Sequence, residues 1–202
     1  MVNTNLTQIK GSEVPEDGAA LNVANKLYID TTDDYKNLTD ITTGKWAWVA
    51  HGINDITPST PEKTQKTAYY DGGGYDETEV TGKSLQLAVK GVRFVGNVAQ
   101  DYITSKQYAI GSATKTRVLW INNGDVLMSA CTLTNIVATG GAADAQQTFS
   151  LTIACNGKPM TTTGKLTLTK NESDLYIASV DDKQPATTPA EINNNENTPK
   201  QN

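Results

Sequence analysis

The stretch GGGYDETEVTGKS (residues 72–84) ends in the Gly-Lys-Ser triplet that closes a phosphate-binding loop. Such a loop needs a glycine five residues before its last glycine, because backbone amides must wrap the phosphates. Glu77 stands at that position, and Asp71, Asp76 and Glu79 surround it with no Lys or Arg among them. Like charges repel a phosphate, and the next residues alternate as in a strand, not a helix. The pattern therefore argues against a nucleotide site and favours an acidic, glycine-bent connection between strands.

Other catalytic or metal-binding patterns are equally hard to find. His51 is the single histidine, so any Ser/His/Asp or Cys/His site would have to use it, and no G-x-S-x-G signature occurs. Zinc needs several His or Cys ligands, and the acids of residues 71–79 lack the spacing of an EF-hand. Two acids could meet in space as a glycosidase pair, but no pair is distinguished. We therefore expect no catalytic residue, no cofactor and no metal.

Net charge and cysteine content further limit the functional classes that the sequence allows. The formal net charge is −5, which argues against a conventional nucleic-acid binder with a basic face. It remains compatible with a surface that nucleic acid passes without adhering. The N-terminal residues have no apolar segment of signal-peptide type, and no 18-residue apolar run predicts a membrane span. Cys131 and Cys155 lie in strand-like runs and are expected to be buried free thiols, a disulfide being the alternative.

Two aromatic groups could serve recognition. Trp46 and Trp48 share one face of a short strand and could stack on a sugar or a base, although packing beneath a helix is the favoured interpretation. Tyr69, Tyr70 and Tyr75 flank the glycine run and suggest a contact between subunits, because tyrosine combines contact area with a polar end.

The elements that must position these residues are mostly strands, because the chain is rich in Thr, Val and Ile. We expect strands at 26–30, 46–50, 85–95, 116–121, 125–137 and 148–155, a hairpin entered or left at 67–71, and a last hairpin about Asn171 within 165–180. Asn123-Gly124 is a strong two-residue hairpin turn. Pro58 and Pro61 make 53–67 a loop or an edge strand. Gly91 coincides with a shift in apolar phase, which predicts a β-bulge.

One helix is expected at residues 98–109. Asn97 would cap it, Gln100 sits at the capping-box position and Gly111 lies just past its end. The sequence then divides into an extended N-terminal arm (1–22), a β domain (23–180) and a disordered C-terminal tail (181–202). We predict a mainly β fold, a sandwich or barrel with one flanking helix and long loops.

Two segments carry a family resemblance. They are KSLQLAVKGVRFVGNVAQDYI at 83–103 and RVLWINNGDVLMSACTLTNIVATGGAADAQQTFSLTIACNGKP at 117–159. A strand leads into a helix start with A-Q-D-Y-I, and a hairpin, a Gly/Ala/Asp loop, a strand and N-G-K-P follow. This order resembles the major tail protein, or tail tube protein, of bacteriophages with long non-contractile tails. The likeness runs from Trp46 to Pro159.

The resemblance implies a tail-tube-type β-sandwich without catalytic residues or cofactor. Such subunits form hexameric rings stacked into a tube around a tape-measure protein, bounded by tail terminator and distal tail proteins. The tube conducts DNA at genome ejection, and the protein passes from the host cytoplasm into the virion. Asp71, Asp76, Glu77 and Glu79 would then face the lumen or a stacked ring, and Tyr69, Tyr70 and Tyr75 a neighbouring subunit.

Three alternatives stay open at this point. A carbohydrate-binding or adhesin-like β-sandwich would use Trp46, Trp48 and the three tyrosines as a sugar platform. A small glycan-active enzyme would use a carboxylate pair that the sequence does not reveal. Within the phage interpretation, the inner tube of a contractile tail is a near neighbour, because the difference lies in a sheath protein encoded elsewhere.

Overall fold

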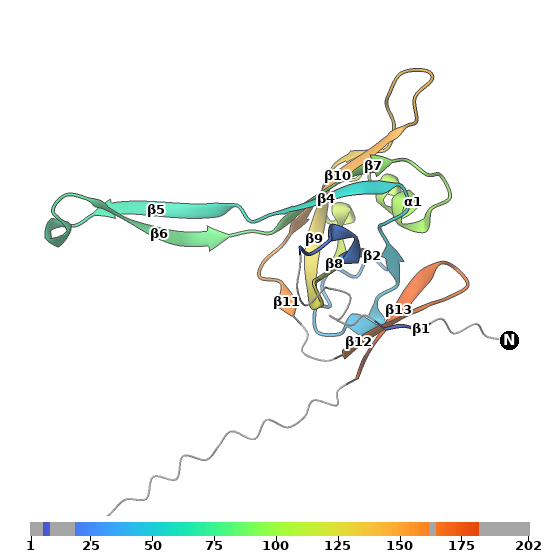
Figure 1. Cartoon of the computed structure of the whole chain (residues 1–202), viewed down its shortest axis with the longest axis horizontal. Coiled ribbons are helices and arrows are strands. Elements are labelled where there is room, and N and C mark those ends of the chain that lie inside the picture. Colours follow the sequence, from blue (N-terminus) through green and yellow to red (C-terminus); the bar gives the residue numbers. More distant parts are fainter. Residues whose placement is uncertain (1–5, 9–18, 162–164, 182–202) are drawn as a thin grey trace, which may run out of the picture.

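The computed structural model describes residues 6–8, 19–161 and 165–181 (Figure 1). The strands are β1 (Leu6–Gln8), β2 (Lys26–Asp30), β3 (Trp46–Trp48), β4 (Ile53–Ser59), β5 (Glu62–Ala68), β6 (Asp76–Lys83), β7 (Gln86–Val92), β8 (Lys115–Asn122), β9 (Asp125–Val137), β10 (Thr148–Cys155), β11 (Met160–Thr161), β12 (Lys165–Lys170) and β13 (Leu175–Asp181). The helix α1 spans Val98–Ser105, and short 3₁₀ turns are η2 (Asn22–Ala24), η3 (Ile41–Thr43), η4 (Tyr70–Gly72) and η5 (Gly111–Thr114).

Eleven of these strands form one antiparallel sheet in the order β1-β12-β13-β3-β2-β8-β9-β10-β7-β4, with β11 paired to β9. The remaining two, β5 and β6, form a separate hairpin. That hairpin extends far from the body on one side, whereas α1 and β13 lie toward the other (Figure 1).

The central strands are buried on both faces. On β2, Leu27 and Ile29 belong to one apolar cluster, whereas Tyr28 belongs to another. β3, β8 and β9 also contribute to both clusters, whereas β7, β10 and α1 pack in the first and η3, β12 and β13 in the second. Because side chains alternate along a strand, the same short segments serve both cores. The mainly β class with one flanking helix is confirmed.

Several local predictions are confirmed in detail. Strands occupy 26–30 and 148–155 as expected, and the last hairpin turns between β12 and β13. Asn123 and Gly124 link β8 to β9 with positive φ angles of 50° and 91°, as a two-residue hairpin turn requires. The strand expected at 46–50 ends at Trp48.

The helix is shorter than predicted. It ends at Ser105, whereas the sequence pattern predicted a helix to residue 109. Asn97 is its N-cap, and its side-chain oxygen accepts a hydrogen bond from the Gln100 backbone N–H at 3.1 Å. The Gln100 side chain does not close a capping box. It accepts from the Phe94 N–H and donates to the carbonyls of His51 and Val92. This buried amide thus ties the start of α1 to two neighbouring segments.

The irregularity expected at Gly91 lies on the opposite strand. The register between β4 and β7 shifts between Ile53 and Asp55, which face Gly91 and Lys90. A Cβ at residue 91 would lie 2.1 Å from the Gly52 carbonyl oxygen and 2.8 Å from the Ile53 Cα. The glycine is therefore needed because another backbone passes directly over it.

Replacing Gly91 with alanine is expected to lower the free energy of unfolding by about 1–3 kcal/mol, because backbone has to move. Urea unfolding measures it. Gly82→Ala is the matched control within β6, since a Cβ there meets only the Lys63 Cβ at 3.6 Å. Equal stability of the two variants would contradict the close approach.

The hairpin expected to be entered or left at 67–71 is confirmed, since β5 ends at Ala68 and pairs with β6. The expectation of long loops is wrong for residues 53–83, where three strands lie. Residues 53–59 form the edge strand β4, one of the two possibilities left open, and the hairpin of β5 and β6 takes up most of the rest. Of the N-terminal arm, residues 6–8 form β1 against β12, while residues 1–5 and 9–18 lie outside the described residues. The tail predicted to be disordered also lies outside them, apart from Asp181 at the end of β13.

The packing of the predicted aromatic and cysteine residues is now defined. Trp46 is fully buried, but in the cluster away from α1, so packing under the helix is wrong for this residue. Trp48 is 41% exposed and lies against the rings of Tyr28 and Tyr176. Cys131 and Cys155 are opposite each other on β9 and β10 as buried free thiols, as expected. Burial raises the pKa of both thiols.

Candidate assembly surfaces

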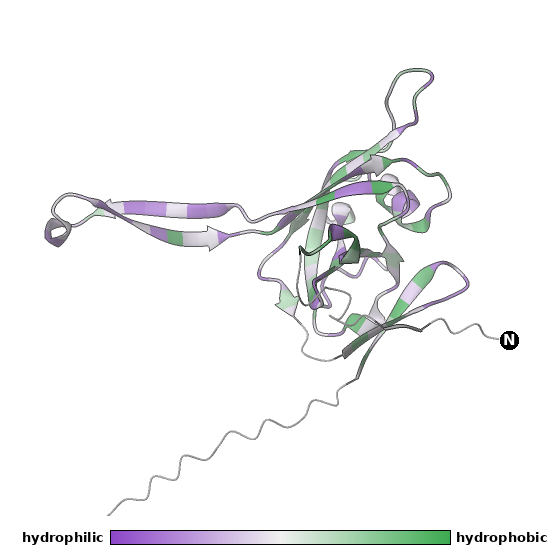
Figure 2. Ribbon diagram, viewed as in Figure 1, coloured by the Kyte–Doolittle hydropathy of each residue, from purple (hydrophilic) through white to green (hydrophobic). Residues whose placement is uncertain are grey.

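The β5–β6 hairpin is an exposed arm. Its register runs from Glu62 opposite Lys83 to Ala68 opposite Asp76, and nearly every residue of both strands is exposed. Hydrophilic and neutral residues predominate along it (Figure 2). An isolated two-stranded hairpin is marginal in water, so an arm of this kind gains most from a partner surface.

The end of the arm is aromatic. Tyr69 leads into η4, and the chain turns through Gly73 and Gly74 with left-handed φ angles of 64° and 87°. Tyr70 is fully exposed and Tyr75 is 84% exposed, with Tyr69 partly so. The three tyrosines predicted as an intersubunit contact are thus brought together at one tip. We call residues 69–75 the arm tip.

The four predicted acids belong to the same arm. Asp71 lies in η4, while Asp76, Glu77 and Glu79 lie on β6, and all are exposed. No Lys or Arg occurs between residues 67 and 82. At the base, Lys83 pairs with Glu62 at 2.7 Å. The distal half of the arm is therefore an acidic and aromatic surface.

The Gly-Lys-Ser triplet does not form a phosphate loop. Gly82 and Lys83 are the last residues of strand β6, and the next regular element is strand β7. A phosphate loop must open a helix whose N-terminus faces the anion. Residues 82–84 instead connect two strands, as the sequence pattern favoured.

The large sheet offers two further surfaces at its edges. Among the described strands, β4 is the last on one side and β1 the last on the other. A terminal strand presents backbone N–H and C=O groups that can pair with another chain. Pro58 in β4 supplies no N–H, and it is exposed.

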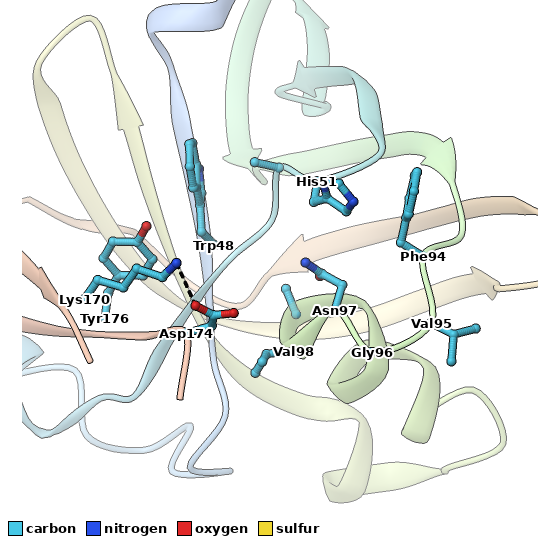
Figure 3. Close-up of a pocket in the computed structure, with 12 residues that line it drawn as sticks. Trp48, His51, Phe94, Val95, Gly96, Asn97, Val98, Lys170, Asp174 and Tyr176 are labelled. Carbon is cyan, nitrogen blue, oxygen red and sulfur yellow. Dashed lines mark ion pairs between the residues drawn. The ribbon is translucent and has the colours of Figure 1, made fainter. Parts of the chain in front are cut away.

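An aromatic groove lies between α1 and the β12–β13 turn (Figure 3). Its volume is about 650 Å³, and its walls include Trp48, His51, Phe94 and Tyr176. The ring centroids of His51 and Phe94 are 4.2 Å apart. Figure 3 shows the ion pair at one end of the groove, in which Lys170 Nζ lies 2.6 Å from Asp174 Oδ1.

The wall carrying Phe94 is held rigidly. Gln100 accepts a hydrogen bond from the Phe94 N–H at 2.7 Å and donates to the His51 carbonyl, also at 2.7 Å. Arg93 forms an ion pair with Asp101, whose other oxygen accepts from the Gly96 N–H. The groove is therefore preformed, which lowers the entropy that the groove itself would lose on binding a partner.

The far end of α1 is anchored to the β2–β3 connection. The Asp33 carboxylate accepts hydrogen bonds from Lys106 Nζ at 2.7 Å and the Tyr102 hydroxyl at 2.6 Å. These two donors, Lys106 above all, lower the pKa of Asp33. Burial together with the Asp33 hydrogen bond raises the pKa of Tyr102. These contacts position the helix that forms one wall of the groove.

Sequence reasoning did not identify the groove. Its aromatic walls come from three segments that are distant in the sequence, and only the fold brings them together. The first segment supplies Trp48 and His51, the second Phe94 and the third Tyr176. The local sequence signal that could have pointed to the groove is the apolar Phe94-Val95 pair, which follows β7. In the structure Val95 is 84% exposed.

Among the described residues no group of three or more His, Cys, Asp or Glu side chains could hold a metal ion. Within the same part of the chain no helix has the length and apolar character to cross a membrane.

Comparison with known proteins gives matches in structure only. No protein-family model and no curated protein matches the sequence. The fold is similar to a chain in the tail of an empty gene transfer agent (GTA) particle, a structure computed with helical refinement and C6 symmetry. The TM-score is 0.58 at 15% identity, covering 72% of this chain and 100% of that one.

A second similar chain comes from the virion of a native GTA particle. Its TM-score is 0.49 at 16% identity, covering 68% of this chain and 95% of that one. The first match confirms the fold that the sequence resemblance implied.

Proposed function

We propose that this chain is the structural subunit of a phage-like tail tube. The observation that carries the proposal is the fold match to the whole length of a chain from a tail with helical and C6 symmetry. The exposed arm and the two sheet edges support the proposal, because they offer surfaces for contact with other chains. In a monomer, an unpaired strand edge would carry a risk of aggregation. We further propose six-membered rings stacked axially, since heterologous contacts close into rings or continue as filaments.

The proposed tube encloses a tape-measure protein, ends at tail terminator and distal tail proteins, and later conducts DNA into the host. The chain would assemble in the host cytoplasm and reside in the virion, as in siphophages. The acidic arm and the net charge of −5 support a role beside DNA, because phosphates do not adhere to a negative surface. The role is structural and needs no cofactor.

The direct test is to purify and concentrate the chain, then combine negative-stain electron microscopy with light-scattering mass. Rings or hollow tubes of uniform diameter are expected. A monomer that binds glycan would instead favour the carbohydrate-binding alternative, for which Trp48 is the exposed tryptophan.

The acids Asp71, Asp76, Glu77 and Glu79 are proposed to face the lumen or a stacked ring. Changing all four to lysine is expected to reduce tube yield or particle infectivity at least about tenfold, because lysines attract DNA phosphates or oppose the stacked surface. Changing the same four to Asn or Gln is the matched control and should have a smaller effect. Tubes and infectivity at normal levels in the lysine variant would contradict this placement.

A further inference from the structure

We infer that the aromatic groove is the docking site for the arm tip of a second copy of this chain. This inference rests on the proposed function and names the two surfaces that meet. The tip presents Tyr69, Tyr70 and Tyr75 on an arm that extends away from its own body (Figure 1). The groove presents Trp48, His51 and Phe94 in a preformed hollow (Figure 3).

The positions of the arm tip and the groove indicate that a second copy of the chain fills the groove. The arm extends to one side of the molecule, and α1 and β13, which flank the groove, lie toward the opposite side (Figure 1). A chain therefore cannot fill its own groove, whereas a second copy can. Contacts between opposite ends are heterologous and repeat from copy to copy, which is the arrangement that produces rings and tubes.

The chemistry of the two surfaces is complementary. Tyrosine rings pack edge-to-face or offset against aromatic walls, and each hydroxyl keeps a polar partner. The arm carries four acids and no base between residues 67 and 82. Lys170 at the end of the groove is exposed and pairs with Asp174 in a surface ion pair. A surface pair of this kind is weak, so an incoming carboxylate can share the ammonium group.

The groove size also fits. Its volume of about 650 Å³ lies within the range of sites that enclose a compact ligand. Val95 stands on the rim with 84% of its surface exposed, and an incoming tip would cover it. Exposed apolar side chains beside a hollow are typical of interaction sites.

Cysteine cross-linking tests this inference. One pool carries Tyr70→Cys and the other Val95→Cys, and the two are mixed, concentrated and oxidised with diamide. Two thiols lose two protons and two electrons to the diamide and form one disulfide, so a covalent dimer is expected in the mixture. Cys131 and Cys155 stay unreactive because they are buried with raised pKa values.

Tyr108→Cys replaces Val95→Cys in the control mixture, because Tyr108 is 89% exposed and outside the groove. The control should give at most one tenth of the dimer. Tubes whose disulfides favour residue 108 would overturn the inference and leave the proposed function standing. A chain that stays monomeric and gives no dimer would overturn both.

Tryptophan emission supplies a second readout without cysteine. Trp46 and Trp120 are buried, so Trp48 is the tryptophan whose surroundings a docked tip would change. A blue shift is expected on assembly of the unmodified chain, and it should be lost in Trp48→Phe. An equal shift in that variant would overturn the inference.

Discussion

Replacing Arg117 with methionine is expected to lower the free energy of unfolding by about 3–5 kcal/mol, because it leaves a buried carboxylate unpaired. Arg117 and Asp30 are both fully buried. Arg117 Nε donates to Asp30 Oδ2 at 2.7 Å, and Nη2 lies 2.6 Å from the same oxygen. Chemical denaturation with urea measures the loss.

The pair also organises the connection between β2 and β3. Arg117 Nη1 donates to the Asn37 carbonyl at 2.6 Å and to the Thr43 hydroxyl at 3.2 Å. Asp30 accepts from the Lys45 N–H at 3.0 Å. Removing the guanidinium therefore leaves several buried polar groups without their partner at once. The loss in the free energy of unfolding should exceed that of an ordinary substitution of one apolar side chain.

Lys83→Met is the matched control, because it also removes the cation of an ion pair, here with Glu62 on the exposed arm. Such surface pairs contribute about 1 kcal/mol or less. A loss below about 1 kcal/mol in Arg117→Met, equal to the control, would show that the buried pair is not a main source of stability.

Changing Tyr69, Tyr70 and Tyr75 together to serine is expected to raise the concentration needed for assembly about a hundredfold or more. Interface tyrosines commonly contribute 1–2 kcal/mol or more each, and each 1.4 kcal/mol is a factor of ten. The monomer should unfold as before, because Tyr70 and Tyr75 are exposed on an arm away from the body. Sedimentation across a concentration series gives the threshold.

Tyr108→Ser is the control, since Tyr108 is equally exposed but lies outside the arm. Its threshold should stay within about threefold of the unmodified chain. A triple variant that assembles at the original concentration would remove the arm tip from the contact, whatever the fate of the groove.

Much of the local structure could be predicted from sequence. Asn123-Gly124 specified a hairpin because both residues tolerate positive φ, and the alternation of Phe149, Leu151 and Ile153 specified β10. Asn97 marked the start of α1 through its side-chain oxygen. These signals act within a few residues, so no tertiary contact is needed to predict them.

Elements without apolar alternation were predicted less well. Residues 62–68 and 76–83 are polar on both faces, so the sequence predicted a hairpin at 67–71 but not the length of the two strands that form the arm. Gly91 suggested a bulge in its own strand, although the reason for the glycine is the backbone at Gly52 passing over it.

The sequence by itself determined most strands of the large sheet, the helix start, the Asn123-Gly124 turn, the clustering of acids and tyrosines, and the resemblance to tail tube proteins. Only the tertiary structure decided that the central strands are buried on both faces and that Arg117 meets Asp30. It also decided that the groove and the arm lie toward opposite ends. The physical reason is range: turn chemistry and alternation act between near neighbours, whereas packing joins segments as distant as Trp48 and Tyr176.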